Sequence, residues 1–225
     1  MQSEDNQNNK PDKKQIEELK GIRLFVAISG SGKSYLTKEY PSHFVDHDGL
    51  RDRFRIGLPL DATDEEVSLR RTESGKTMAE EAAYSEQVML DALSKDDGKI
   101  ILTSPVPYVM ESIKKHKLPY VMITYDQTNP ELIQEFRKRR LRRGDTEQIA
   151  DWLEGMMYDY NDQWLNDNDA NAVFKLSKGK YIADVIDLVH GTTFSQNSKG
   201  HSVEGVQKMI VDARPTKTLL TNPKK

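Results

Sequence analysis

The chain has 225 residues, of which 36% are hydrophobic and 31% are charged, and its formal net charge at pH 7 is −3. This length is typical of one α/β domain with a sizeable core. The net charge gives no general basic field, so any affinity for nucleic acid must come from a local patch. Cysteine is absent, which excludes disulfides and thiolate metal sites.

No stretch of the sequence approaches the ~18 apolar residues of a membrane span, and the first ten residues show no apolar signal region. We therefore expect no membrane contact and a cytoplasmic location, which for a viral protein is the host cytoplasm. Residues 1–20 are polar and are predicted to be a disordered arm. Residues 21–191 are predicted to form one domain, and residues 192–225 a flexible tail with at most a short helix near 203–211. The sequence does not indicate the oligomeric state.

A strand, a glycine turn and a helix follow one another between residues 22 and 40. Residues 22–28 are apolar apart from Arg23 and include the β-branched Ile22, Val26 and Ile28, and a helix is predicted from 32 or 33 to about 40, just before Pro41. The turn between them is predicted to bind phosphate through its backbone N–H groups and the helix N-terminus. The residues of this turn are Ser29, Gly30, Ser31, Gly32, Lys33 and Ser34.

The last two residues of the turn predict the cofactors. In a phosphate-binding loop of this form, Lys33 reaches the β- and γ-phosphates of ATP, and the Ser34 hydroxyl ligates Mg²⁺. The full pattern G-x-x-x-x-G-K-[ST] has glycine where this chain has Ala27. Alanine is the smallest replacement, and we expect it to be tolerated at a strand end.

Two aspartates follow the second predicted strand. Phe44 and Val45 form this strand, and Asp46 and Asp48 lie at its carboxyl end, where open parallel sheets bind ligands. On an extended backbone the two carboxylates point to the same side. Asp48 would then accept a proton from an attacking hydroxyl while Asp46 orients Mg²⁺. The alternative is structural: Asp48 caps the next helix, with Gly49 in its first turn.

Arg51 and Arg53 lie on that next helix. Arginines at this place are candidates to clamp a substrate phosphate bidentately. The alternative is two arginines on a solvated helix face. His43 and His47 share a strand face, but two histidines without a third ligand do not define a metal site, so we expect ordinary, partly buried residues.

Three further strands complete the predicted fold class, which is α/β with a parallel five-stranded sheet and helices on both faces. These strands are predicted at 99–103, 120–125 and 172–177. Further helices are predicted near 107–117, from Asn129 with Pro130 in the first position, and at 181–191.

The helix from Asn129 ends in a basic run. Its charged residues are Arg137, Lys138, Arg139, Arg140, Arg142 and Arg143. Like charges this close repel one another, so in isolation the run is expected to fray unless a polyphosphate or a nucleic-acid backbone relieves the repulsion. Arg139 and Arg143 share a helix face and Gly144 supplies a hinge, which predicts a helical lid that closes over the transferring phosphoryl group. The alternative is a solvated basic helix or a general nucleic-acid patch.

A strongly amphipathic helix is predicted after Asp145. Its large apolar residues follow a 3.6-residue period and are predicted to be core, not a stacking platform for bases. They are Ile149, Trp152, Leu153, Met156, Met157, Tyr160 and Trp164.

The order of these motifs resembles the small P-loop kinases: phosphate loop, D-x-D-x-x-R, third strand, arginine-rich K-R-x-x-R-R-G lid, helix, strand and helix. Over residues 21–190 the chain is most similar to bacteriophage-type polynucleotide kinase domains, and more distantly to shikimate, gluconate and nucleoside-monophosphate kinases. The resemblance implies that Asp48 is the catalytic aspartate, that Arg51 positions the acceptor, and that Arg139 and Arg143 are the lid arginines.

Two residues depart from that pattern. Asp46 stands where polynucleotide kinases tend to carry asparagine, and Ser104 replaces an aspartate expected after the third strand. The missing aspartate shifts the magnesium-orienting role towards Asp46 and Asp48.

The sequence therefore predicts an ATP- and Mg²⁺-dependent kinase that transfers the γ-phosphate to a hydroxyl on a nucleic acid or a nucleotide. A general base at Asp48 favours a hydroxyl acceptor, because a nucleoside monophosphate already presents an anionic oxygen at pH 7. The basic lid, with Arg51 and Arg53, indicates an acceptor that is phosphorylated or part of a nucleic acid. Two alternatives stay open: a deoxynucleoside-monophosphate kinase, and a nucleotide-binding ATPase or switch with no second substrate.

Overall fold

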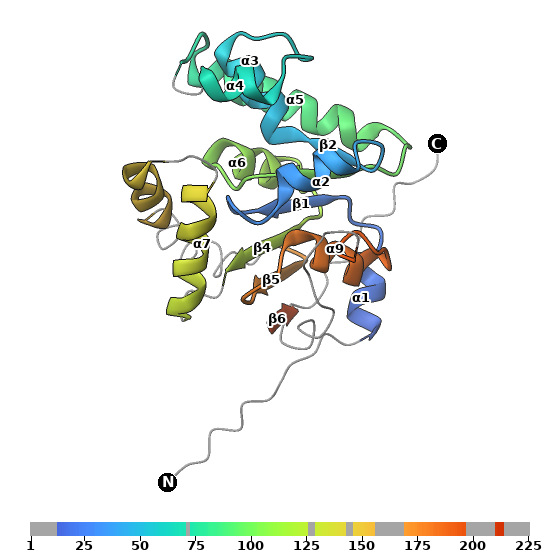
Figure 1. Ribbon diagram of the computed structural model, residues 1–225. Helices are drawn as coiled ribbons and strands as arrows, with labels where there is room; N and C mark the ends of the chain where they lie inside the picture. The colour runs from blue at the N-terminus through green and yellow to red at the C-terminus, as the bar shows by residue number, and fades with distance from the viewer. Residues whose placement is uncertain are drawn as a thin grey trace, which may run out of the picture. The chain divides into compact units, whose positions relative to one another are not determined.

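The structure is a computed structural model that describes residues 13–70, 73–125, 129–142, 146–155, 169–196 and the strand backbone at 210–213. The chain divides into two compact units. The β1–β3 unit consists of Arg23–Ala27 and Lys33–Pro119. The β4–β6 unit consists of the described parts of Met1–Ile22, Ile28–Gly32 and Tyr120–Lys225. Figure 1 labels the helices and strands.

Three parallel strands form the sheet of the β1–β3 unit. Its strands, in sheet order, are β2 (Phe44–Asp46), β3 (Ile100–Thr103) and β1 (Leu24–Ala27). All four residues of β1 and of β3 are buried, which explains why β1 is an unbroken apolar run and why β3 is apolar up to its last residue, Thr103. Because β2 and β3 are parallel, their carboxyl ends lie side by side, with Asp46 opposite Leu102.

The helices of this unit connect its strands or follow them. Helix α2 (Lys33–Glu39) leads from β1 to β2, and α6 (Pro107–Lys115) follows β3. Three helices lie between β2 and β3 in the chain: α3 (His47–Ile56), α4 (Asp64–Leu69) and α5 (Met78–Ser94). Helix α5 packs beside α3, as Figure 1 shows.

Side-chain caps determine where α3 and α5 begin. Asp46 is the N-cap of α3, and its carboxylate accepts a hydrogen bond of 3.0 Å from the N–H of Gly49. The alternative prediction that Asp48 caps this helix is therefore wrong, and so is the extended backbone assumed for it, because Asp48 lies in the first helical turn. Thr77 caps α5 in a reciprocal box with Glu80.

The β4–β6 unit has parallel and antiparallel pairs. Strands β4 (Val121–Tyr125) and β5 (Ala172–Leu176) are parallel, and β6 (Ile210–Ala213) is antiparallel to β5. The prediction of a flexible tail is wrong at this last strand. The five predicted strands are all present, and every pair that they form within a unit is parallel, which confirms the α/β class.

The helices of the β4–β6 unit include one that the sequence did not predict. Residues Lys13–Leu19 form α1, which packs against α9 (Ile182–His190) and buries Leu19, so the prediction of a disordered arm is wrong there. Helix α7 (Pro130–Arg142) begins as predicted and is helical through the basic run as far as Arg142. Across the part of the chain that the structure describes, no helix combines the length and apolar character that crossing a bilayer requires.

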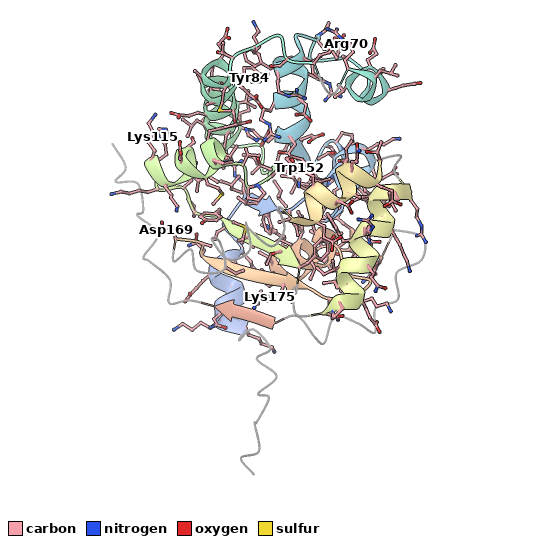
Figure 2. All side chains as sticks on the ribbon, turned by 90° about the vertical axis from the view of Figure 1, so that its left-hand side faces the viewer. Arg70, Tyr84, Lys115, Trp152, Asp169 and Lys175 are labelled. Atoms are coloured by element: carbon pink, nitrogen blue, oxygen red, sulfur yellow. The ribbon has the colours of Figure 1, made fainter. Side chains whose placement is uncertain are left out.

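Residues 147–155 form a helix whose predicted core positions are only partly buried. Ala150 is buried, but Ile149 is 40% exposed and Trp152, labelled in Figure 2, is 63% exposed. Asp151 and Glu147 of this helix both accept hydrogen bonds from Arg137 of α7. The core prediction is wrong for the two exposed residues. Its members Met156, Met157, Tyr160 and Trp164 lie outside the described residues.

Candidate functional site

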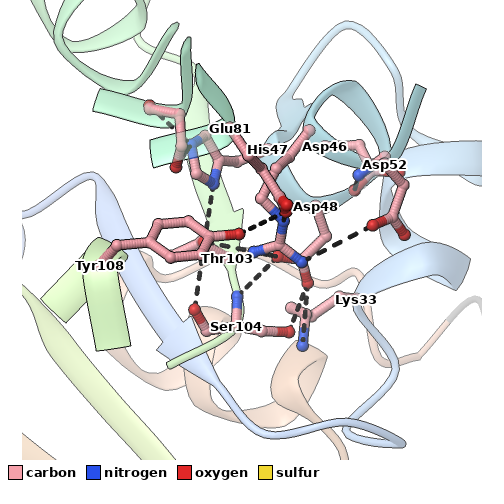
Figure 3. Close-up of polar contacts among 12 residues, drawn as sticks. Lys33, Asp46, His47, Asp48, Asp52, Glu81, Thr103, Ser104 and Tyr108 are labelled. Atoms are coloured by element: carbon pink, nitrogen blue, oxygen red, sulfur yellow. Dashed lines mark hydrogen bonds and ion pairs between the residues drawn. The ribbon is translucent and has the colours of Figure 1, made fainter. Parts of the chain in front are cut away.

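The candidate site of the β1–β3 unit is built around Asp48. The cap at Asp46 starts α3 immediately after β2, which places Asp48 in the first helical turn. Strand β3 is the neighbour of β2, so the residue that follows β3, Ser104, comes close to Asp48. Two segments more than fifty residues apart therefore meet at this carboxylate (Figure 3).

Ser104 holds both oxygens of the Asp48 carboxylate. The Ser104 N–H donates to Oδ1 at 2.8 Å, and the Ser104 hydroxyl donates to Oδ2 at 2.5 Å. Two cations complete the surroundings: Lys33 Nζ lies 3.5 Å from Oδ2, and Arg51 Nη1 lies 3.3 Å from Oδ1. The arrangement fixes the orientation of the carboxylate and keeps it ionised.

The pKa of Asp48 follows from these contacts. Burial alone would raise the pKa, but the charges of Lys33 and Arg51 and the hydrogen bond from Ser104 outweigh it and lower the pKa to about 2. A carboxylate with so low a pKa is a weak base, although it remains an effective hydrogen-bond acceptor at neutral pH.

Lys33 is the cation next to Oδ2 of Asp48, and its own side chain is buried. Its Nζ donates a hydrogen bond of 2.5 Å to the carbonyl of Ala27 at the end of β1. Burial lowers the pKa of Lys33, while the neighbouring Asp48 acts in the opposite direction. Ala27, which stands where the sequence pattern has glycine, thus contributes its backbone oxygen to the site.

Arg51 has carboxylates on three sides and yet lacks good hydrogen-bond geometry. Besides Asp48, its guanidinium lies 3.5 Å from a Glu81 oxygen and 3.9 Å from an Asp52 oxygen. The residue is 8% exposed, and neither Nε nor Nη1 donates a hydrogen bond. The Tyr108 hydroxyl donates to Glu81 at 2.5 Å, and burial raises the pKa of Tyr108, so this phenol stays neutral. Arg51 thus keeps buried donors that point among acidic side chains.

Ser34 and Asp46 are the predicted magnesium ligands, and their chemistry fits Mg²⁺ only in part. Both offer oxygen, and Mg²⁺ in phosphoryl-transfer sites commonly takes one or two side chains and fills its other positions with water and phosphate. Within the described ranges, no cluster of three or more His, Asp or Glu could hold a metal ion. Asp46 uses Oδ1 for the helix cap, and burial raises its pKa. Ser34 is exposed.

Arg53, predicted to contact substrate, makes a local contact instead. Its Nε donates to the Ala62 carbonyl at 2.8 Å, which holds the loop between α3 and α4. His43 is exposed, whereas His47 is fully buried, so the expectation of two partly buried histidines is wrong for both.

In the β4–β6 unit, residues 29–32 of the predicted phosphate loop are held by contacts with β4, with α7 and with the residues around α9. Gly30 and Gly32 have φ of +78° and +102°, which favours glycine at both positions. The Gly30 carbonyl accepts a hydrogen bond of 2.8 Å from Tyr125, and the Ser31 carbonyl accepts one of 2.9 Å from the N–H of Ile182. The turn is therefore anchored through its carbonyls.

The arginines of α7 do not play one common role. Arg139 pairs with Glu135 and stacks on the Tyr181 ring at 4.0 Å, so it is docked on its own unit. Arg140 is 3% exposed, and its Nη1 donates to the Ser29 hydroxyl at 2.9 Å. Arg143 lies outside the described residues. In the described part of the basic run, the arginine that touches the loop is therefore Arg140, not Arg139.

Sequence reasoning missed four residues of these two sites. For Ser104 a signal existed, because Thr103-Ser104 ends a buried strand beside the Asp48 segment. For Arg140 a signal also existed, since it continues the buried face formed by Ile133 and Phe136. Glu81 and Tyr108 carried no signal, because nothing in their local patterns points towards Arg51.

No protein-family model matches the chain, and no curated protein matches it either. The residues and contacts described above are therefore the basis for assigning a function.

Proposed function

We propose that the protein is an ATP- and Mg²⁺-dependent phosphotransferase that moves the γ-phosphate to a hydroxyl group of a nucleic acid or a nucleotide. The observation that supports this most is the pairing of Lys33, which follows the glycine turn directly, with the ionised Asp48 at 3.5 Å. In such a transfer a lysine binds the phosphates and a carboxylate binds the acceptor hydroxyl, so the two side chains must lie on either side of the same phosphoryl group.

In the proposed reaction, the acceptor oxygen forms a bond to the γ-phosphorus while the bond from phosphorus to the bridging oxygen of ADP breaks. Lys33 offsets the charge on the phosphoryl oxygens, and Ser34 with Asp46 would hold Mg²⁺, which neutralises phosphate charge when bound. Asp48 accepts the hydroxyl proton. Because its pKa is about 2, its main task is to orient the hydroxyl, and the proton moves late, when the acceptor oxygen has become acidic.

The surroundings of Arg51 support a hydroxyl at the acceptor position over a phosphate. A phosphate monoester placed there would face the carboxylates of Asp48, Asp52 and Glu81 within the same few ångströms. A neutral hydroxyl can accept a hydrogen bond from Arg51 Nη1 and donate one to Asp48. This favours a hydroxyl kinase over the nucleoside-monophosphate kinase, whose acceptor brings its own negative charge.

The proposal is tested by following labelled γ-phosphate from ATP to a panel of 5′-hydroxyl oligonucleotides, DNA with hydroxymethylated bases, nucleoside monophosphates and small sugar or cyclohexene alcohols. Replacing Lys33 by alanine should abolish transfer, whereas Lys38→Ala, on an exposed residue of the same helix, should not. Asp48→Asn should lower kcat by about 10²–10⁴-fold with ATP affinity kept within a few-fold. The exposed Asp91→Asn is its control.

Three outcomes contradict parts of the proposal. Unchanged turnover in Asp48→Asn would remove the role of this carboxylate. Transfer that survives Lys33→Ala would contradict the assignment of residues 29–34 as a phosphate-binding loop. Label that appears only as free phosphate, with every acceptor in the panel, would assign the protein to the ATPase or switch class instead.

A further inference from the structure

A fully buried histidine lies behind the Asp48 carboxylate. His47 occupies the first position of α3, and its ring reaches both β3 and α5. Nδ1 lies 2.7 Å from the Thr103 hydroxyl, and Nε2 lies 3.0 Å from the Ser85 carbonyl oxygen and 3.2 Å from the Ser85 hydroxyl. One side chain thus connects the start of α3, the end of β3 and the middle of α5 (Figure 3).

These contacts determine the tautomer of the ring. A carbonyl oxygen can only accept, so the nitrogen that faces the Ser85 carbonyl, Nε2, must carry the proton. In the neutral ring Nδ1 is then an acceptor, and the Thr103 hydroxyl must donate to it. The ring is fully buried, and its hydrogen-bond partners are hydroxyl and carbonyl groups with no carboxylate among them, so the neutral form fits this place.

The Thr103 hydroxyl has a single hydrogen, and the tautomer of His47 decides which acceptor receives it. Its oxygen lies 2.7 Å from His47 Nδ1, 3.4 Å from the Ser104 carbonyl oxygen and 3.5 Å from Asp48 Oδ1, so the shortest contact takes the hydrogen. Thr103 is thereby tied to α3, and the next residue, Ser104, is the one that holds both Asp48 oxygens. The His47–Thr103 bond therefore connects the helix that carries Asp48 to the strand that orients it.

We propose that His47 is a positioning residue: through its Nδ1 bond to Thr103 it holds the end of β3 so that Ser104 presents both of its donors to the Asp48 carboxylate. The bond to Ser85 keeps the ring in the tautomer that makes Nδ1 an acceptor. The effect on catalysis depends on the proposed phosphotransferase function, whereas the tautomer and the Ser104 contact do not.

Two substitutions separate the roles of the two ring nitrogens. The asparagine oxygen in His47→Asn can occupy the position of Nδ1 and keep the Thr103 bond, while the Ser85 bond is lost. The glutamine amide in His47→Gln can occupy the position of Nε2 and keep the Ser85 bond, while the Thr103 bond is lost. His43→Gln, on the exposed histidine four residues earlier, is the control for histidine replacement.

The measurements are ¹⁵N NMR of the wild-type histidine ring, hydrogen exchange of the Ser104 amide, and the steady-state kinetics of phosphate transfer. We expect a neutral ring with the proton on Nε2. We expect His47→Gln to speed Ser104 amide exchange about tenfold or more and to lower kcat by about 10–100-fold, with the KM for ATP within a few-fold. In His47→Asn, the rate of Ser104 amide exchange and kcat should both stay closer to the wild-type values than in His47→Gln.

Several results would overturn the inference. One is a wild-type ring protonated on Nδ1, which needs no variant to detect. Another is an equal loss in the asparagine and glutamine variants, which would indicate a merely structural histidine. If the glutamine variant fails to fold, Thr103→Val replaces it, because it removes the same hydroxyl; unchanged Ser104 exchange there would also refute the role. Absent transfer in the wild type, with the expected NMR results, would reject the proposed function alone.

Discussion

Replacing Ser104 by alanine should weaken the fold in a way that depends on pH. The substitution removes the 2.5 Å hydrogen bond from the serine hydroxyl to Asp48 Oδ2 and leaves the 2.8 Å bond from the backbone N–H. A hydrogen bond to a charged group contributes about 1.5–3 kcal/mol. The drop of the Asp48 pKa from 3.8 to about 2 amounts to roughly 2 kcal/mol, and Lys33 and Arg51 account for more of it than Ser104. We therefore expect a loss of about 1 kcal/mol at pH 7.

The pH dependence follows from the sign of the shift. Because the pKa of Asp48 is lower in the folded protein, the ionised carboxylate stabilises the fold above pH 3.8, and this contribution disappears as the pH falls towards 2. The difference between wild type and Ser104→Ala should be full at pH 7 and should be lost as the pH falls through 2. Urea unfolding followed by circular dichroism across this range measures it.

Ser94→Ala provides the matched control. Its hydroxyl also donates a hydrogen bond, at 2.8 Å, but to the backbone carbonyl of Asp91, so its effect should not change with pH in this range. A Ser104→Ala effect that is the same at pH 7 and near pH 1.5 would refute the role assigned to the Asp48 contact, as would no effect at all at pH 7.

Three further substitutions test the β4–β6 unit by urea unfolding. Asp184→Asn leaves Lys180 without its buried carboxylate partner at 3.1 Å and should cost about 3 kcal/mol; a loss below about 1 kcal/mol would contradict a buried ion pair. Gly30→Ala should cost about 1–3 kcal/mol, because φ is +78° and the new Cβ would lie 2.9 Å from the Phe136 ring; an unchanged midpoint would contradict this turn conformation. Trp152→Ala should change stability by less than about 0.5 kcal/mol, and a larger loss would mean that this exposed side chain is packed.

Local patterns in the sequence predicted the strands, because a strand that is buried on both faces has a mostly apolar sequence. Leu24–Ala27 and Ile100–Thr103 show this directly. The glycines between the first strand and the helix predicted the turn. Position in the sequence also brought Asp48 and Lys33 into one hypothesis, since both follow predicted strands. The sequence marked Ser104 as the residue after a strand, but its contact with Asp48 depends on the pairing of β2 with β3, and strand order is a property of the whole sheet. The bond from His47 to Thr103 was out of reach for the same reason.

The errors had two physical causes. Helix α1 was missed because its polar sequence contains few apolar residues, yet burying Leu19 against α9 is enough to dock it. At Trp152 the error was the opposite one, since the apolar period was present but the side chain is exposed, while Glu147 and Asp151 of the same helix pair with Arg137. Arg140 is a further example, because it is buried although its charge is typical of an exposed residue.

The contact between Lys33 and Asp48 implies that nucleotide and acceptor sites are not independent under the proposed function. Lys33 lies 3.5 Å from Asp48 and helps to keep the proton affinity of that carboxylate low. Phosphate groups that draw the ammonium towards themselves remove part of this attraction and add negative charge nearby, so the proton affinity of Asp48 rises. Under the proposed function, arrival of the nucleotide would thereby turn Asp48 from a poor base into a better one.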